Sequence, residues 1–186
     1  QPLIDELGVP DAVSVLETER ILKEEKPSAV LITSPSFYGF TADIRALSEA
    51  AHRNGIPLLA DEAHGAHFAA CPDIFPMPAI KSGADMCVQS AHKTLNAANQ
   101  TAFLHVAGNI IDRERVRKCF SIFQTTSPCY PLMATADAAV CELKEKGAAM
   151  WGRVHRRCAE LREKNYFVSP DRTWLGRYNF TDIDEC

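Results

Sequence analysis

The chain has 186 residues, 46% of them hydrophobic and 24% charged, and its formal net charge is −4. This balance indicates a globular domain rather than a disordered chain, and no stretch approaches the roughly 18 to 20 uncharged apolar residues of a membrane helix. The mild negative charge argues against a nucleic-acid partner, and seven scattered cysteines without a C-x-x-C pair favour free thiols and a cytoplasmic location.

Helical and strand patterns alternate in the first half of the chain. In order, we expect a helix before Pro27 with the apolar stripe Val13, Leu16, Ile21 and Leu22, a strand over 28–35, a helix over 42–54 that Gly55 ends, and strands over 56–62 and 84–90. The first of these helices, before Pro27, is expected to begin at Pro10 and Asp11. Buried strands that alternate with helices predict a parallel sheet with helices on both sides.

The second half begins with one more strand and then becomes helical. A strand over 101–108 follows the previous one so closely that an antiparallel neighbour is expected. We then expect a helix capped by Asp112, a helix over 130–146 that ends at Gly147, and a last helix that carries Trp151 and Val154. The predicted fold class is therefore α/β, with three α/β/α layers and a mostly parallel sheet that contains one antiparallel strand.

The stretch LLADEAHGAH at residues 58–67 places acids and histidines at the end of an expected strand. A DEAH-type helicase would also need the phosphate-binding loop G-x-x-x-x-G-K-[ST], and residues 1–57 contain none. The two histidines do not form H-E-x-x-H, so no metal site is expected. A triad of Ser90, His92 and Asp61 is disfavoured because its serine lacks the G-x-S-x-G turn.

A different pair of residues suggests cofactor chemistry. Asp61 ends one buried strand and Lys93 follows the end of the next, so we expect both to face the crevice at the carboxyl ends of the strands. Pyridoxal 5'-phosphate needs a lysine amine that forms a Schiff base with its aldehyde and an acid beside its pyridine nitrogen. Ser90 and His92 flank the lysine, and we expect them to donate hydrogen bonds to the cofactor phosphate.

Five strings closely resemble, in order and spacing, the large domain of the pyridoxal-phosphate-dependent ornithine/lysine/arginine decarboxylases. They are TSPSFYGF, LLADEAHGAHF, GADMCVQSAHKTL, QTAFLHV and QTTSPCYPLMATAD, and the similarity extends over about residues 28–147. The resemblance implies a fold-type-I cofactor domain that works as a homodimer. It also implies cofactor contacts for Lys93 (the Schiff-base lysine), Asp61 (pyridine nitrogen), Ala63 (ring), His64 (phenolic oxygen), Ser90 and His92 (phosphate), and Thr126 (phosphate of the partner subunit's cofactor).

By the same resemblance, residues 1–168 form part of the cofactor domain and residues 169–186 begin a linker or a small C-terminal domain. The family's upstream phosphate loop and ring-stacking histidine have no counterpart here, so the chain resembles an internal piece of a longer enzyme. The implied reaction is the decarboxylation of lysine, ornithine or arginine to an amine of polyamine synthesis. Two alternatives stay open, namely another fold-type-I reaction such as transamination or lyase chemistry, and a non-catalytic dimerisation module.

Overall fold

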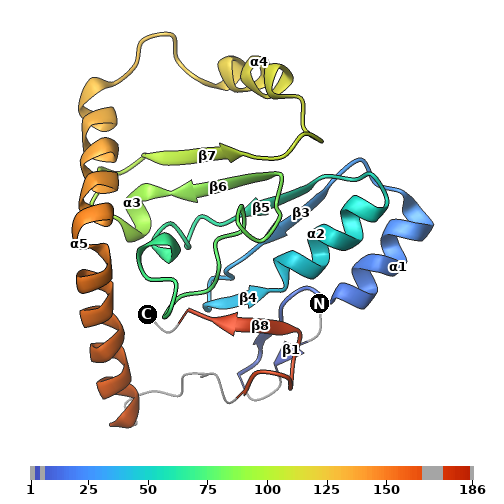
Figure 1. Ribbon diagram of the computed structural model, residues 1–186, viewed down its shortest axis with the longest axis horizontal. Helices are drawn as coiled ribbons and strands as arrows, with labels where there is room; N and C mark the ends of the chain where they lie inside the picture. The colour runs from blue at the N-terminus through green and yellow to red at the C-terminus, as the bar shows by residue number, and fades with distance from the viewer. Residues whose placement is uncertain (1–2, 5–6, 165–173, 185–186) are drawn as a thin grey trace.

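The computed structural model describes residues 3–4, 7–164 and 174–184, and Figure 1 shows the arrangement of their helices and strands. In chain order the elements are β1 (Leu3–Ile4), β2 (Val9–Pro10), α1 (Val15–Glu25), β3 (Val30–Thr33), β4 (Phe40–Ala42), α2 (Ile44–Arg53), β5 (Leu58–Asp61), the 3-10 helix η1 (Phe68–Ala70), β6 (Met86–Ser90), α3 (Ala91–Thr94), β7 (Ala102–Val106), α4 (Arg113–Phe123), α5 (Tyr130–Glu163) and β8 (Phe180–Ile183).

Four strands form the central sheet in the order β3-β5-β6-β7. The first three are parallel neighbours, whereas β7 is antiparallel to β6, with Cys87 opposite His105. Only residues 91–101 separate β6 from β7, which is short for a helical crossover of about a dozen residues or more. The prediction of an α/β fold with a mostly parallel sheet and one antiparallel strand is therefore confirmed.

Local side-chain bonds set the starts of α1 and α2. The side chains of Ser14 and Asp43 each accept a hydrogen bond from the backbone N–H three residues later. Such an N-cap stabilises a helix by about 1 kcal/mol, and it makes α1 begin after Ser14 rather than at the expected proline. The predicted apolar stripe of α1 is only partly correct, because Leu22 is buried whereas Leu16 and Ile21 are exposed.

The two faces of the central sheet have different surroundings. Alternation along the strands turns Ile32 and Cys87 toward one face, where they share a hydrophobic core with the buried residues of α2. Leu31 and Val88 point the other way and are 70% and 41% exposed. α4 lies beside Leu104 on this second face, across a groove of about 500 Å³, but buries none of its own residues. A complete third layer therefore stays a prediction.

α5 is one continuous helix where the sequence pattern predicted two. The break expected at Gly147 does not occur, and the helix runs from Tyr130 to Glu163. Gly147 is buried, and a Cβ atom there would lie 3.1 Å from the Cβ atom of Ala70. This glycine therefore allows α5 to approach η1 closely instead of ending a helix. Within the described part of the chain, neither α5 nor any other helix has the length and apolar composition to cross a bilayer.

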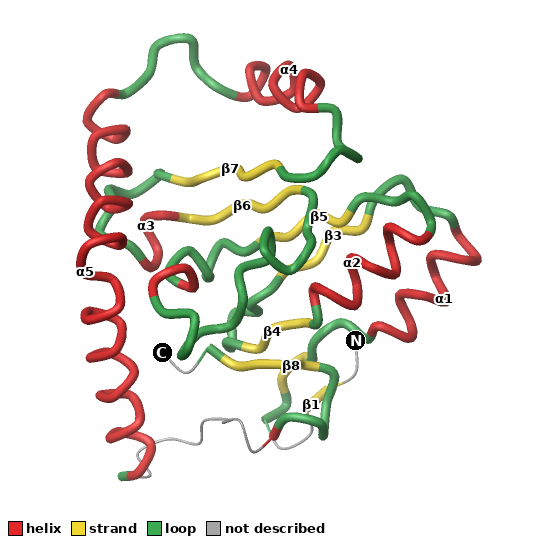
Figure 2. The backbone as a smooth tube through the Cα atoms, in the orientation of Figure 1, coloured by secondary structure: helices red, strands yellow, loops and turns green. Residues whose placement is uncertain are grey.

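The last described segment adds a strand that the sequence pattern did not indicate. β8 pairs antiparallel with β4, with Ile183 opposite Phe40, and the rings of Phe40 and Phe180 are 4.6 Å apart. In Figure 2 this pair lies alongside the central sheet, on the side away from β7. The pairing attaches the C-terminal segment to the chain that follows β3. The predicted domain boundary at residue 168 falls within 165–173, outside the described residues.

Replacing Gly147 with alanine should stabilise α5 less than the same change at Gly152. Alanine is favoured over glycine in a helix by about 1 kcal/mol, but a methyl group at position 147 would press on Ala70. At position 152 it would meet only Arg156 Nη1, at 3.7 Å. Urea denaturation should therefore give Gly152→Ala a free energy of unfolding about 1 kcal/mol or more above that of Gly147→Ala. Equal values for the two variants would contradict the packing role of Gly147.

Candidate active site

Two neighbouring parallel strands bring Asp61 and Lys93 to one edge of the central sheet. Asp61 is the last residue of β5 and is in register with Val88 of β6. β6 ends two residues later at Ser90, and Lys93 follows in the four-residue helix α3. Figure 2 shows β6 leading into α3 beside α5. Because parallel strands end at the same edge of a sheet, the acid and the amine lie on the same side of the molecule.

His64 interacts with both of these groups. Lys93 Nζ is 3.2 Å from His64 Nε2, and Nε2 accepts this hydrogen bond because an ammonium group can only donate. Burial lowers the pKa of His64 and the charge of Lys93 lowers it further, whereas the carboxylates of Asp61 and Asp184 act in the opposite direction. The neutral imidazole is therefore favoured, with its Nε2 lone pair directed at the lysine.

Backbone hydrogen bonds hold the Asp61 carboxylate and the loop that follows it. Ala63 N donates to Asp61 Oδ1 over 3.1 Å, which orients the carboxylate. Ala63 O accepts from Ser90 N over 3.3 Å, which ties the loop after β5 to the end of β6. Ala63 thus connects the strand that carries the acid to the strand that leads to the lysine.

Ser90 and His92 place polar groups next to Lys93. The hydroxyl of Ser90 makes no capping bond to α3, and His92 Nδ1 donates to Thr101 O over 2.8 Å. The other ring nitrogen of His92 can donate to a phosphate only when the imidazole is protonated. An amine, a carboxylate, a hydroxyl and an imidazole at one sheet edge are groups that fit pyridoxal phosphate. The cofactor roles of these residues stay predictions.

Thr126 lies apart from this cluster. It is exposed in the loop that joins α4 to α5, and Figure 1 shows this loop beyond β7, at the top of the view. Asp61 and Lys93, in contrast, follow from the inner strands β5 and β6. One copy of the chain therefore does not bring Thr126 to the other predicted site residues. Its expected contact with the cofactor of a partner subunit stays a prediction.

Glu62, next to Asp61, is a buried acid for which the sequence suggested no role. It is only 2% exposed, and it accepts hydrogen bonds from Ala79 N over 2.8 Å and from Gln89 Nε2 over 2.6 Å. Burial raises the pKa of Glu62, although these donors oppose the rise. Because successive residues of a strand point to opposite faces, Glu62 and Asp61 diverge. Two consecutive acids at the end of a strand therefore indicate, from the sequence alone, that one of them faces the crevice and the other points to the opposite side.

One cavity is lined by Lys93 and a second by its hydrogen-bond partner His64, and α5 contributes to the wall of each. The residues of the first, which has a volume of about 340 Å³, include Lys93, Leu95, Trp151, Val154 and Asp184. Those of the second, of about 300 Å³, include Tyr38, His64, Arg162 and Asp184. Asp184 lines both cavities, and no sequence pattern pointed to it.

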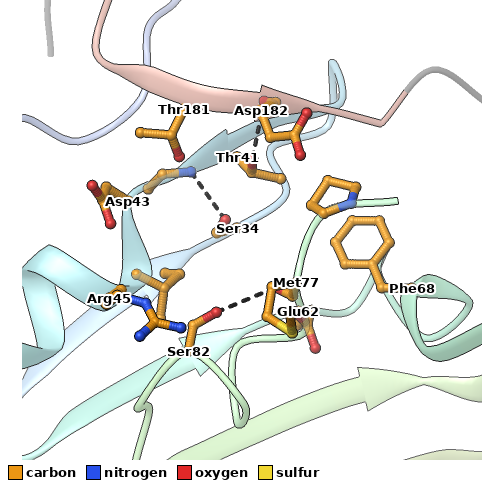
Figure 3. Close-up of a pocket in the computed structure, with 13 residues that line it drawn as sticks. Ser34, Thr41, Asp43, Arg45, Glu62, Phe68, Met77, Ser82, Thr181 and Asp182 are labelled. Atoms are coloured by element: carbon orange, nitrogen blue, oxygen red, sulfur yellow. Dashed lines mark hydrogen bonds between the residues drawn. The ribbon is translucent and has the colours of Figure 1, made fainter. Parts of the chain in front are cut away.

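A separate cavity lies on the far side of Glu62. Figure 3 shows its lining, which includes Glu62 and Arg45 and encloses about 230 Å³. The hydrogen bond from Thr41 Oγ1 to Asp182 O, drawn in the same view, joins β4 to β8 at its rim. It shares no lining residue with the other two cavities, so it is distinct from both.

Comparisons with known proteins relate the chain to one family. The family model described as Orn/Lys/Arg decarboxylase, major domain, matches residues 11–177. An arginine decarboxylase of Bacillus cereus is 34% identical over 181 residues, which cover 94% of this chain and 39% of that enzyme. The YaaO protein of Bacillus subtilis is 46% identical over 111 residues, which cover 59% of this chain and 23% of that protein. The structure of the E. coli constitutive lysine decarboxylase matches with a TM-score of 0.70 and 23% identity, over 85% of this chain and 24% of that one.

Replacing Glu62 with glutamine should change how stability depends on pH. The raised pKa of Glu62 means that the folded chain binds this proton more tightly than the unfolded chain does. The stability that Glu62 contributes is therefore fully present below its ordinary value of 4.5 and is lost as pH rises through the folded pKa. The free energy of unfolding of the wild type minus that of Glu62→Gln, from urea denaturation, should thus fall as pH rises above 4.5. A difference that stays constant or rises would show that the folded protein does not raise this pKa.

Proposed function

Because the chain belongs to the Orn/Lys/Arg decarboxylase family, we propose that it supplies the lysine and the acid with which a pyridoxal-phosphate enzyme decarboxylates a basic α-amino acid. The substrate is lysine, ornithine or arginine, and the product is the corresponding amine. One observation carries the proposal: Lys93 Nζ is 3.2 Å from His64 Nε2, and the charge of Asp61 acts on the same imidazole. An amine and an acid that share one neighbour are close enough to hold two ends of a small pyridine ring.

Lys93 and Asp61 have different tasks in this proposal. The Lys93 amine would hold the cofactor by its aldehyde, where the amino group of the substrate would replace it. The Asp61 carboxylate keeps a proton on the pyridine nitrogen, because an opposite charge at close range favours the charged form. Bound pyridoxal phosphate supplies the sink for the electron pair that remains when the bond between Cα and the carboxylate breaks.

His64 offers a place for the proton of Lys93. An amine attacks an aldehyde only in its neutral form, and the neutral imidazole of His64 is within 3.2 Å of the ammonium group. After carbon dioxide has left, the same pair can return a proton to the substrate carbon. Ser90 and His92 would hold the phosphate, and Ala63 would lie against the ring.

The assembly and location of the enzyme belong to the same proposal. We infer a homodimer in which Thr126 reaches the phosphate in the partner subunit. The exposed side chains of Phe120, Ile122 and Phe123 on α4 support this inference, because they offer apolar surface to a second chain. The six described cysteines form no disulfide with one another, which favours the reducing cytoplasm.

Borohydride reduction in the presence of pyridoxal phosphate should attach the cofactor to Lys93. Mass spectrometry should find one label on the peptide that contains Lys93, because reduction makes the bond between the amine and the aldehyde permanent. Lys93→Ala should lose the label. Lys81→Ala is the matched control, since Lys81 is also exposed but precedes β6. A label that survives Lys93→Ala, or that appears equally on Lys81, would contradict the assignment.

In the full-length enzyme, Asp61→Asn should lower kcat by on the order of 10² or more and change KM less, because the acid acts where charge develops in the transition state. Asparagine keeps an oxygen for the bond from Ala63 N, so the loop is preserved. Asp73→Asn, at an exposed position, is the control. The assay should detect carbon dioxide and the amine together. Release of a 2-oxo acid instead would identify transamination and overturn the proposed reaction.

A further inference from the structure

We propose that Asp184 binds the distal cation of the basic amino acid on which Lys93 acts, an inference that rests on the function proposed above. The cavity of about 340 Å³ beside Lys93 is within the range of about 300–1,000 Å³ for small-molecule sites. Leu95, Trp151 and Val154 contribute apolar walls to it, and Asp184 contributes an acid. An alkyl chain that ends in an ammonium or guanidinium group needs both features, an apolar wall along its length and a negative charge at its end.

The charge distribution around Lys93 supports this assignment. Among the described residues that line the two cavities beside Lys93, Asp184 is the only acid. Its side chain is 14% exposed, and Oδ2 lies 3.1 Å from His67 Nε2. Its charge also reaches His64, where it opposes the lowering of the pKa by burial. A carboxylate in such surroundings attracts a cation more strongly than one in bulk water, because fewer water molecules screen the interaction.

The backbone around Asp184 is held by a specific contact. Asp184 N donates to Gly39 O over 2.9 Å, directly after the pairing of β8 with β4. Gly39 has a φ angle of 87°, and a Cβ atom there would lie 3.0 Å from Asp184 O. Only glycine tolerates both the backbone angle and the close approach. The carboxylate is thus positioned by the sheet rather than carried on an unconstrained tail.

A binding comparison tests the assignment without any turnover. The probes are 1,5-diaminopentane and 1-aminopentane, which match in length and differ in the distal cation. Calorimetric titration of the full-length protein before cofactor is added should give Asp184→Asn a dissociation constant for the diamine that is higher by on the order of 10-fold or more. The constant for the monoamine should not change. Asp184→Glu, which keeps the charge, should retain the preference for the diamine.

The control is Asp182→Asn, because Asp182 lies in β8, two residues before Asp184, but lines the separate cavity of Figure 3. It should bind both amines like the wild type. If Asp184→Asn weakened both amines equally, Asp184 would act only by holding His67, and the proposal would be overturned. Unchanged affinity for the diamine would overturn it as well.

Kinetics of the holoenzyme provide a second measurement. Asp184→Asn should raise KM for the basic amino acid by on the order of 10-fold or more and change kcat less, because the distal contact is made equally in the ground and transition states. Lys93 should still take up the borohydride label in this variant. If Lys93 of the wild type took up no borohydride label, the proposed function would be refuted. If Asp184→Asn took up the label but its KM were unchanged, only the role of Asp184 would be refuted.

Discussion

The parallel pairing of β5 with β6 is the interaction on which the candidate site depends. Asp61 is opposite Val88, and Glu62 N continues the ladder by donating to Val88 O over 2.9 Å. β6 therefore extends two residues past the level of the acid before α3 delivers Lys93. A slip of one residue would turn Asp61 toward the hydrophobic core and Glu62 toward the crevice, because side chains alternate along a strand. Register, and not proximity in the sequence, decides which acid meets the amine.

The two consecutive acids illustrate how one strand end serves chemistry and structure at once. Asp61 faces the side of the lysine, and its carboxylate accepts a hydrogen bond from Ala63 N. Glu62 is buried on the other side and joins the loop at Ala79 to β6 at Gln89. A buried carboxylate is tolerated only where donors compensate for its lost hydration. The network around Glu62 thus stiffens the strand end from which Asp61 projects.

Segments that come much later in the chain close the space around Lys93. α5 contributes Trp151, whose ring stacks on His67 at a centroid distance of 4.2 Å, and Gly147 lets the helix approach η1. β8 then delivers Asp184 between the two cavities. The apolar and acidic walls beside the lysine are therefore assembled from parts of the chain that share no local sequence pattern.

The sequence by itself determined the local features: the apolar strands, the Asp112 cap of α4, the antiparallel β7, and the positions of Asp61 and Lys93 at strand ends. These follow from periodicity, capping chemistry and connection length, each of which is written in consecutive residues. Only the tertiary structure decided that α5 continues through Gly147, that Leu16 is exposed, and that the segment after β8 brings an acid to the lysine. The reason is physical, since burial and strand pairing depend on partners distant in sequence, and a local pattern does not specify which surface it will meet.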